Sequence, residues 1–107
     1  FRVVVLPASD VAPLEALPGI RAAVGDGLAL MIDSGFRRGS DIVKALALGA
    51  DMVFVGRAPL YGITAGGEAG ARHAIGILRS EVDRVLALLG CPSVRELGAD
   101  YLWRPDK

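Results

Sequence analysis

The sequence lacks several features that would assign it to a particular class of protein. One of its 107 residues is cysteine and one is histidine, so it has neither an internal disulfide nor a set of metal-ligand spacings. We therefore expect a reducing, cytoplasmic location, a packing role for Cys91 and no metal site. Basic and acidic residues number 12 each, and this balance argues against a nucleic-acid partner. No apolar run approaches the roughly 20 residues that a membrane-spanning helix needs.

The residues that are present indicate a folded α/β protein. Apolar residues make up 52% of the chain and charged residues 22%, which is typical of a globular domain. Three apolar runs, at residues 3–6, 28–32 and 52–55, show no alternation with polar residues, as expected for strands buried on both faces of a parallel sheet. They begin about 25 residues apart, which is the spacing of successive β/α units.

Helical patterns fill the segments between and after these runs. The first covers residues 13–24, with an expected break at Pro18 and Gly19. The second is expected to begin at an N-cap on Ser40 and to stop at Gly49. A longer helix is expected over residues 68–89, because apolar residues recur there every three or four positions, and a brief helix over residues 93–97.

This order of elements predicts part of a larger fold. Three parallel strands do not close a barrel, and a free sheet of this kind would expose two edges. We predict the C-terminal three β/α units of a TIM (β/α)8 barrel, plus a short C-terminal helix. Residues 1–107 would then be the C-terminal part of a single barrel domain, a fragment rather than an independent domain.

Glycine and arginine follow two of the predicted strands at the point where each ends. These residues are Asp33, Gly35, Arg37, Arg38 and Gly39 after the second strand, and Gly56 and Arg57 after the third. Barrels of β/α units bind phosphate with the loops after their last two strands, where glycine N–H groups and arginines can meet one anion. The simpler alternative is that Asp33 pairs with an arginine and caps the following helix.

The same residues carry a resemblance to a known family. The stretch Asp33-Ser34-Gly35-Phe36-Arg37-Arg38-Gly39, with Gly56-Arg57 and the later Gly66-Gly67-Glu68-Ala69-Gly70, resembles the C-terminal part of FMN-dependent α-hydroxy-acid dehydrogenases and oxidases. This family includes glycolate oxidase, lactate oxidase and mandelate dehydrogenase. The likeness covers residues from about 13 to 102, and the first stretch is closest to the mandelate dehydrogenase version.

The resemblance implies a cofactor, a reaction and a set of binding residues. The cofactor would be FMN, and the complete enzyme would oxidise a small 2-hydroxy acid to a 2-oxo acid. The residues that would bind FMN are Asp33, Ser34, Gly35, Phe36, Arg37, Gly56 and Arg57. The partners would be the remainder of the barrel and, in a homo-oligomer, further copies of the chain. Any membrane association would be made through parts of the protein outside these residues.

The residues that carry out the family's chemistry are absent from the matching position. In the family, a histidine and an arginine follow the sixth strand, but here residues 3–6 are followed by Pro7-Ala8-Ser9-Asp10-Val11-Ala12. Either this loop is deleted, or it belongs to the molecule but not to these residues. We favour the second, because the pattern downstream is unbroken. No catalytic residue is therefore assigned, and His73 is expected to be a solvated helix residue.

Two other functions remain open from the sequence. One is a different phosphate-binding barrel, such as IMP dehydrogenase or the flavin-dependent isopentenyl-diphosphate isomerase. The double arginine after Gly35 and the Leu60-Tyr61-Gly62 segment argue against it. The other is a catalytically inactive half-barrel that binds only phosphate or a partner protein, which the missing histidine favours.

Overall fold

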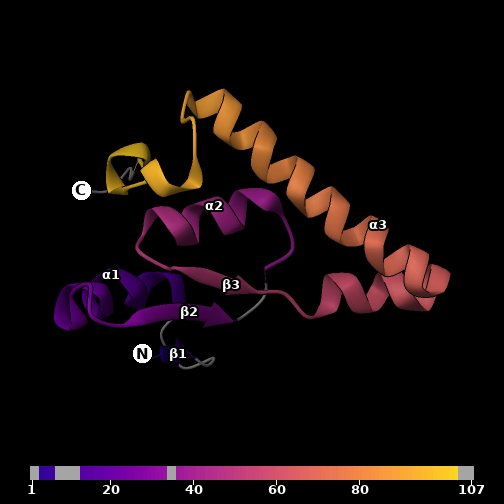
Figure 1. The fold of residues 1–107 in the computed structure, drawn as a ribbon, viewed down its shortest axis with the longest axis horizontal. Helices are drawn as coiled ribbons and strands as arrows, with labels where there is room; N and C mark the ends of the chain where they lie inside the picture. Colours follow the sequence, from indigo (N-terminus) through magenta and orange to yellow (C-terminus); the bar gives the residue numbers. More distant parts are fainter. Residues whose placement is uncertain (1–2, 7–12, 34–35, 104–107) are drawn as a thin grey trace.

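The computed structural model describes residues 3–6, 13–33 and 36–103 as a small parallel sheet packed against helices (Figure 1). The strands are β1 (Val3–Leu6), β2 (Ala29–Asp33) and β3 (Met52–Phe54), and they lie in the order β1-β2-β3. Both pairs are parallel, with Val3 opposite Ala29 and Met31 opposite Met52. The predicted α/β class and parallel order are therefore confirmed for the described residues.

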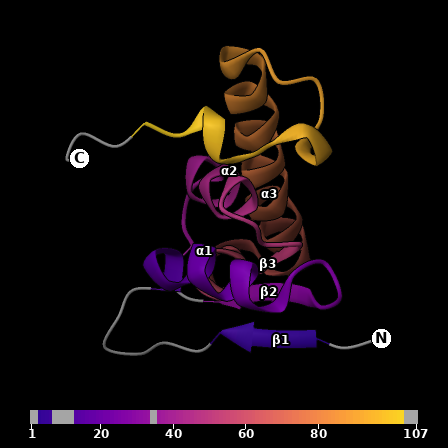
Figure 2. The same ribbon diagram turned by 90° about the vertical axis from the view of Figure 1, so that its left-hand side faces the viewer.

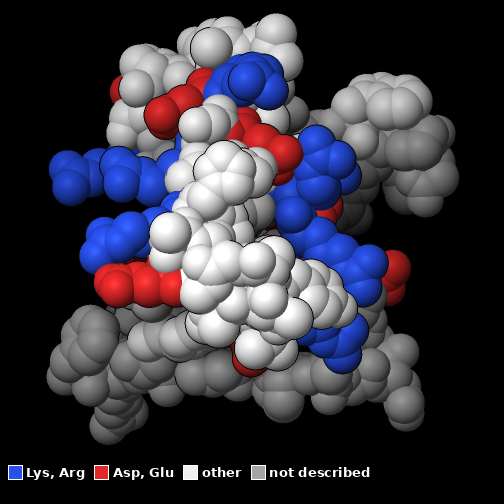
Figure 3. All heavy atoms as spheres, turned by 90° about the vertical axis from the view of Figure 1, so that its right-hand side faces the viewer, with Lys and Arg blue, Asp and Glu red and all other residues white. Residues whose placement is uncertain are grey.

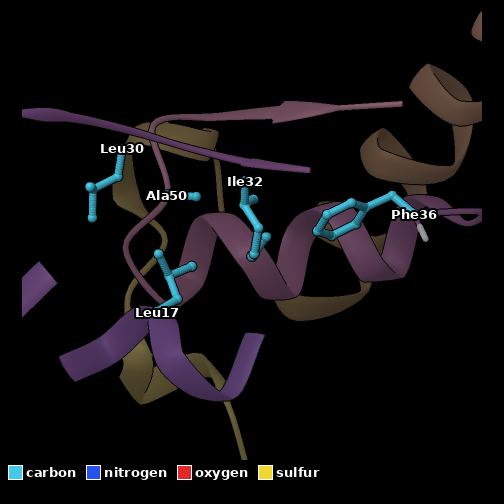
Figure 4. Close-up of a cluster of buried hydrophobic side chains, with 6 residues drawn as sticks. Leu17, Leu30, Ile32, Phe36 and Ala50 are labelled. Carbon is cyan, nitrogen blue, oxygen red and sulfur yellow. The ribbon is translucent and has the colours of Figure 1, made fainter. Parts of the chain in front are cut away.

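One face of this sheet is covered by helices, and the other is open. Leu30 and Ile32 are 0% exposed and pack against Leu17 of α1 and Ala45 of α2 (Figure 4). The register places Met52 beside Met31, so it lies on the opposite face from Ile32. On that face, Met52 is 52% exposed and Phe54 is 41% exposed. Both faces of the sheet carry apolar side chains, but within the described residues only one face is buried.

Helix α1 (Pro13–Val24) is continuous, so the expected break at Pro18 and Gly19 is wrong. Proline lacks one N–H donor, which costs the helix the bond that would reach the carbonyl of Leu14. The side chain of Leu17 is fully buried and anchors this helix to the core. This packing outweighs the helix-breaking tendency of Pro18 and Gly19.

Helix α2 (Gly39–Ala47) begins two residues earlier than predicted, since its N-cap residue is Arg38 and not Ser40. Arg38 is at the N-cap position, where its guanidinium has no acceptor with which to cap the helix, and the carboxylate of Glu81 in α3 accepts the N–H of Gly39 instead. The predicted end at Gly49 is confirmed, since Gly49 has a φ of +117° just beyond the last turn.

Helix α3 (Arg57–Leu89) is longer than predicted and is bent. Gly66 and Gly67 have non-helical backbone angles, so the expected helix over residues 68–89 is the second of two helical segments. The first segment was missed because Pro59 and Gly62 weaken its helical pattern. At the bend the segments touch through glycine: a Cβ on Gly62 would lie 2.8 Å from the carbonyl carbon of Gly70.

The second segment of α3 packs on α2 and covers it (Figures 1 and 2). Its predicted apolar stripe is only partly buried: Leu78 and Leu86 lie inside, whereas Ile75 and Leu89 are exposed. The chain then forms two 3-10 turns, Val94–Glu96 and Ala99–Tyr101, where a short helix over residues 93–97 was expected. The described residues contain no helix that is both long and apolar enough to cross a membrane.

Candidate functional site

The carboxyl ends of β2 and β3 lie side by side and form the edge at which the predicted site residues gather. Asp33, the last residue of β2, is the register partner of Phe54, the last residue of β3. The segments that follow the two strands therefore leave the sheet at the same edge. The predicted residues Ser34 and Gly35 lie outside the described residues.

Helix α3 begins at this edge with its backbone N–H groups uncapped. Gly56 is its N-cap residue, no side chain caps it, and its first turn contains no acidic residue. The first N–H groups of a helix have no partner within the helix, and their dipoles favour an anion. A Cβ built on Gly56 would meet nothing within 4 Å, so this approach is open, and Arg57 follows directly with an exposed side chain. The chemistry of these donors fits a phosphate group.

The residues after β2 contribute in different ways. The ring of Phe36 is buried in the core beside Ile32, so only its backbone remains for a ligand. Arg37 is exposed and makes no hydrogen bond or ion pair with another described residue. Asp33 is also exposed and pairs with no arginine of the described segments, so the structure gives no support to the simpler capping alternative.

Arg38, unlike Arg37, is paired with an acidic side chain of the described residues. Its Nη2 lies 3.0 Å from Oε2 of Glu81, and its Nε donates to both oxygens of that carboxylate at 3.2 and 3.1 Å. The hydrogen bond to Glu81, followed by the negative charge of that carboxylate, raises the pKa of Arg38. The hydrogen bond from Arg38, followed by the one from the Gly39 N–H, lowers the pKa of Glu81. The contact of Glu81 with Arg38 and Gly39 was not predicted from the sequence, where Glu81 lies on the polar side of the expected helix.

The opposite edge of the sheet holds a hollow of about 730 Å³ around the amino ends of β2 and β3. Its charged centre is Arg21 of α1, which pairs with Asp51 at 2.6 Å and donates to three backbone carbonyls. Because these donors are already used, Arg21 ties elements together here and is not available to a ligand.

Charged side chains of both signs surround the face turned outward by the bend in α3. Figure 3 shows an uncharged central surface there, with Lys and Arg on both flanks and acidic groups beside several of them. A nucleic-acid surface would need a broad patch of positive charge, and the coloured part of this face carries none.

The sequence profile of the family described as FMN-dependent dehydrogenase matches residues 8–104. The chain belongs to this FMN-dependent dehydrogenase family. The match begins after β1, so the assignment of residues 3–6 to a sixth barrel strand remains a prediction. The expected resemblance and the FMN cofactor class are confirmed.

Two of the following three curated relatives are named for the expected chemistry. The chain is 50% identical over 92 residues to (S)-mandelate dehydrogenase of Pseudomonas putida, covering 86% of this chain and 23% of that one. It is 44% identical over 92 residues to an L-lactate oxidase of Nostoc sp., covering 86% and 25%. It is also 50% identical to a pre-mycofactocin synthase of Mycobacterium tuberculosis, covering 85% and 23%.

A solved structure shares the fold. An oxidised active mutant of (S)-mandelate dehydrogenase superposes with a TM-score of 0.88 at 45% identity, covering 96% of this chain and 31% of that one. The chain spans about a quarter of the length of the curated relatives it matches, 23% for the mandelate dehydrogenase.

Proposed function

We propose that this chain is the part of a longer FMN-dependent enzyme that binds the phosphate end of the cofactor, and that the whole enzyme oxidises a 2-hydroxy acid to a 2-oxo acid. The observation that carries the proposal is the carboxyl edge of the sheet. There the uncapped start of α3 and the exposed arginines Arg37 and Arg57 lie beside the ends of β2 and β3. Two relatives named for hydroxy-acid oxidation support the reaction class.

The open face of the sheet supports a barrel as the setting for this edge. In a closed barrel of β/α units, side chains on the inner face pack against one another in layers. Met52 and Phe54 lie on the face that the described helices leave uncovered, as inner-face residues would in a fragment. We therefore infer that β1, β2 and β3 belong to the last three units, with the remaining units supplied by the rest of the protein.

Each site residue has a distinct task in this proposal. Arg57 and the N–H groups at the start of α3 bind the phosphate, and Arg37 adds a second positive charge. The carboxylate of Asp33 accepts a hydrogen bond from a hydroxyl of the ribityl chain, and Phe36 contributes its backbone. When bound, the flavin supplies the redox chemistry by accepting two electrons from the substrate.

The proton of the substrate needs a base that these residues do not supply. The one histidine, His73, is exposed and borders a hollow of about 370 Å³ that only residues of α3 line. A base must come within hydrogen-bond reach of the proton it takes. We assign proton removal, and recognition of the substrate carboxylate, to parts of the enzyme outside this chain.

The full-length protein tests this proposal directly. We expect the purified protein to show flavin absorbance, and anaerobic addition of mandelate, lactate or glycolate to bleach it. The matched acids without the hydroxyl group, phenylacetate, propionate and acetate, are the controls and should leave the spectrum unchanged.

The three possible functions give different results. A colourless protein that FMN does not reconstitute would indicate an inactive half-barrel. A flavin-bound protein that no 2-hydroxy acid bleaches would indicate another flavin-dependent barrel. Bleaching by one of the acids, but not by its control, would support the proposed reaction and identify the preferred side chain.

A further inference from the structure

The N-terminus of α2 is occupied by an acidic side chain from a distant part of the sequence. Oε1 of Glu81, in α3, accepts the N–H of Gly39 at 2.7 Å, across 42 residues of chain. The same carboxylate pairs with Arg38 at 3.0 Å. The Glu81 side chain is only 18% exposed, so it lies in the contact between the two helices and not on an open surface.

The backbone at this point is packed too closely for a side chain. A Cβ on Gly39 would lie 2.7 Å from both the carbonyl carbon of Glu81 and the amide nitrogen of Val82. Real Cβ atoms do not approach backbone atoms this closely, so the start of α2 abuts α3 directly. This contact fixes the position at which the chain enters α2, directly after Arg37 and Arg38.

The two helices that begin at the carboxyl edge therefore differ in what they offer an anion. At α2 an internal carboxylate already accepts the first N–H group and neutralises Arg38. At α3 the start of the helix is uncapped and Arg57 has no partner among the described residues. A phosphate dianion placed at the start of α2 would meet the charge of Glu81, whereas at α3 it meets only donors.

We propose that Glu81 is a positioning residue for the cofactor phosphate. It occupies the anion position at the start of α2, anchors Arg38 and Gly39, and thereby presents Arg37 toward the phosphate held at the start of α3. This inference rests on the proposed FMN function. The hydrogen bonds from Arg38 and Gly39 lower the pKa of Glu81, and its neighbour Arg84 acts in the same direction, so the group is anionic at neutral pH.

The test compares two ligands that differ only in the phosphate. Full-length apoprotein is titrated with FMN and with riboflavin, and flavin fluorescence reports binding. For Glu81→Ala we expect the FMN dissociation constant to rise about tenfold, which is typical when a residue that supports a binding side chain is lost. Riboflavin affinity should not change. Glu81→Gln keeps an acceptor for the Gly39 N–H, so we expect it to recover part of the loss.

Matched variants separate positioning from general damage. Asp83→Asn removes a carboxylate from an exposed position of the same helix and should change neither titration. Arg38→Ala leaves the Gly39 contact intact, so its FMN affinity should lie between those of wild type and Glu81→Ala. If Glu81→Ala does not fold, the Arg38→Ala variant still tests the proposal.

The possible outcomes are distinct. A loss of FMN and riboflavin affinity by the same factor in Glu81→Gln and Arg38→Ala would overturn the proposal, because a structural defect has no preference for phosphate. Unchanged FMN affinity in both variants would overturn it as well. A wild-type protein that binds neither flavin would instead contradict the proposed function itself.

Discussion

Arginine side chains stand at both edges of the same parallel sheet, but the two edges use them in different ways. At the amino edge, Arg21 donates to the carbonyls of Gly49 at 2.9 Å and Gly25 at 2.7 Å, and pairs with Asp51. At the carboxyl edge, Arg37 and Arg57 make no hydrogen bond or ion pair with any described residue. The comparison shows that a satisfied guanidinium stabilises the fold, whereas an unsatisfied one is available to a ligand.

The same contrast appears between neighbouring residues within the carboxyl edge. Arg38 is tied to Glu81, while Arg37 is not. Barrels of β/α units separate their tasks in this way, with stability at the amino face and ligand chemistry at the carboxyl face. Substitutions at the two edges should therefore change different measured quantities, and this is the basis of the following predictions.

The largest effect is expected from Arg21→Ala at the amino edge. This change removes donors to three carbonyls and leaves Asp51 without its cation, so we expect the free energy of unfolding of the full-length protein to fall by about 3 kcal/mol. Urea denaturation measures this loss, and FMN affinity of the folded protein should not change. The control is Arg95→Ala, an exposed arginine beside the same hollow. A stable Arg21→Ala protein with weakened FMN binding would reverse the comparison.

A smaller effect, on binding alone, is expected from Arg57→Ala at the carboxyl edge. Loss of a charged donor to phosphate should raise the FMN dissociation constant by about tenfold to a hundredfold, with the urea midpoint of the apoprotein unchanged. Fluorescence titration of the apoprotein with FMN measures it. His73→Ala, at the exposed histidine of α3, is the control and should bind FMN as the wild type does. Equal effects of the two substitutions would mean that the site is misplaced.

The sequence was informative wherever a feature depends on residues close together along the chain. The strands were predictable because each is a short apolar run, and β1 was predicted with its observed bounds. Gly56 and Arg57 were recognised because they follow one such run directly. The likeness to the family rested on the same local stretches, and the family profile confirms it.

Features that depend on contacts between distant segments were not predictable. The start of α2 was placed at Ser40 because the partner of Gly39 is 42 residues away, in a segment whose polar residues read as a solvated face. The first segment of α3 was missed because Gly62 reads locally as a helix breaker. In the structure Gly62 is required by the close contact with Gly70 at the bend. For the same reason the residue pattern by itself offered both Arg37 and Arg38 to a phosphate, and only the resemblance to the family singled out Arg37; in the structure Arg38 has an acidic partner.

The smallest effect is expected from Asp51→Asn, which sharpens the comparison within the amino edge. The asparagine side-chain oxygen can still accept the N–H of Leu30, now 2.8 Å from the carboxylate, while the charge opposite Arg21 is lost. Since the Asp51 side chain is 55% exposed, water screens this pair, and we expect a loss of about 0.5–1 kcal/mol in the free energy of unfolding. Urea denaturation in low and high salt measures it, and the difference from wild type should shrink as salt screens the charge. A loss as large as that of Arg21→Ala, shrinking as salt is added, would show that the ion pair and not the carbonyl contacts holds this edge together.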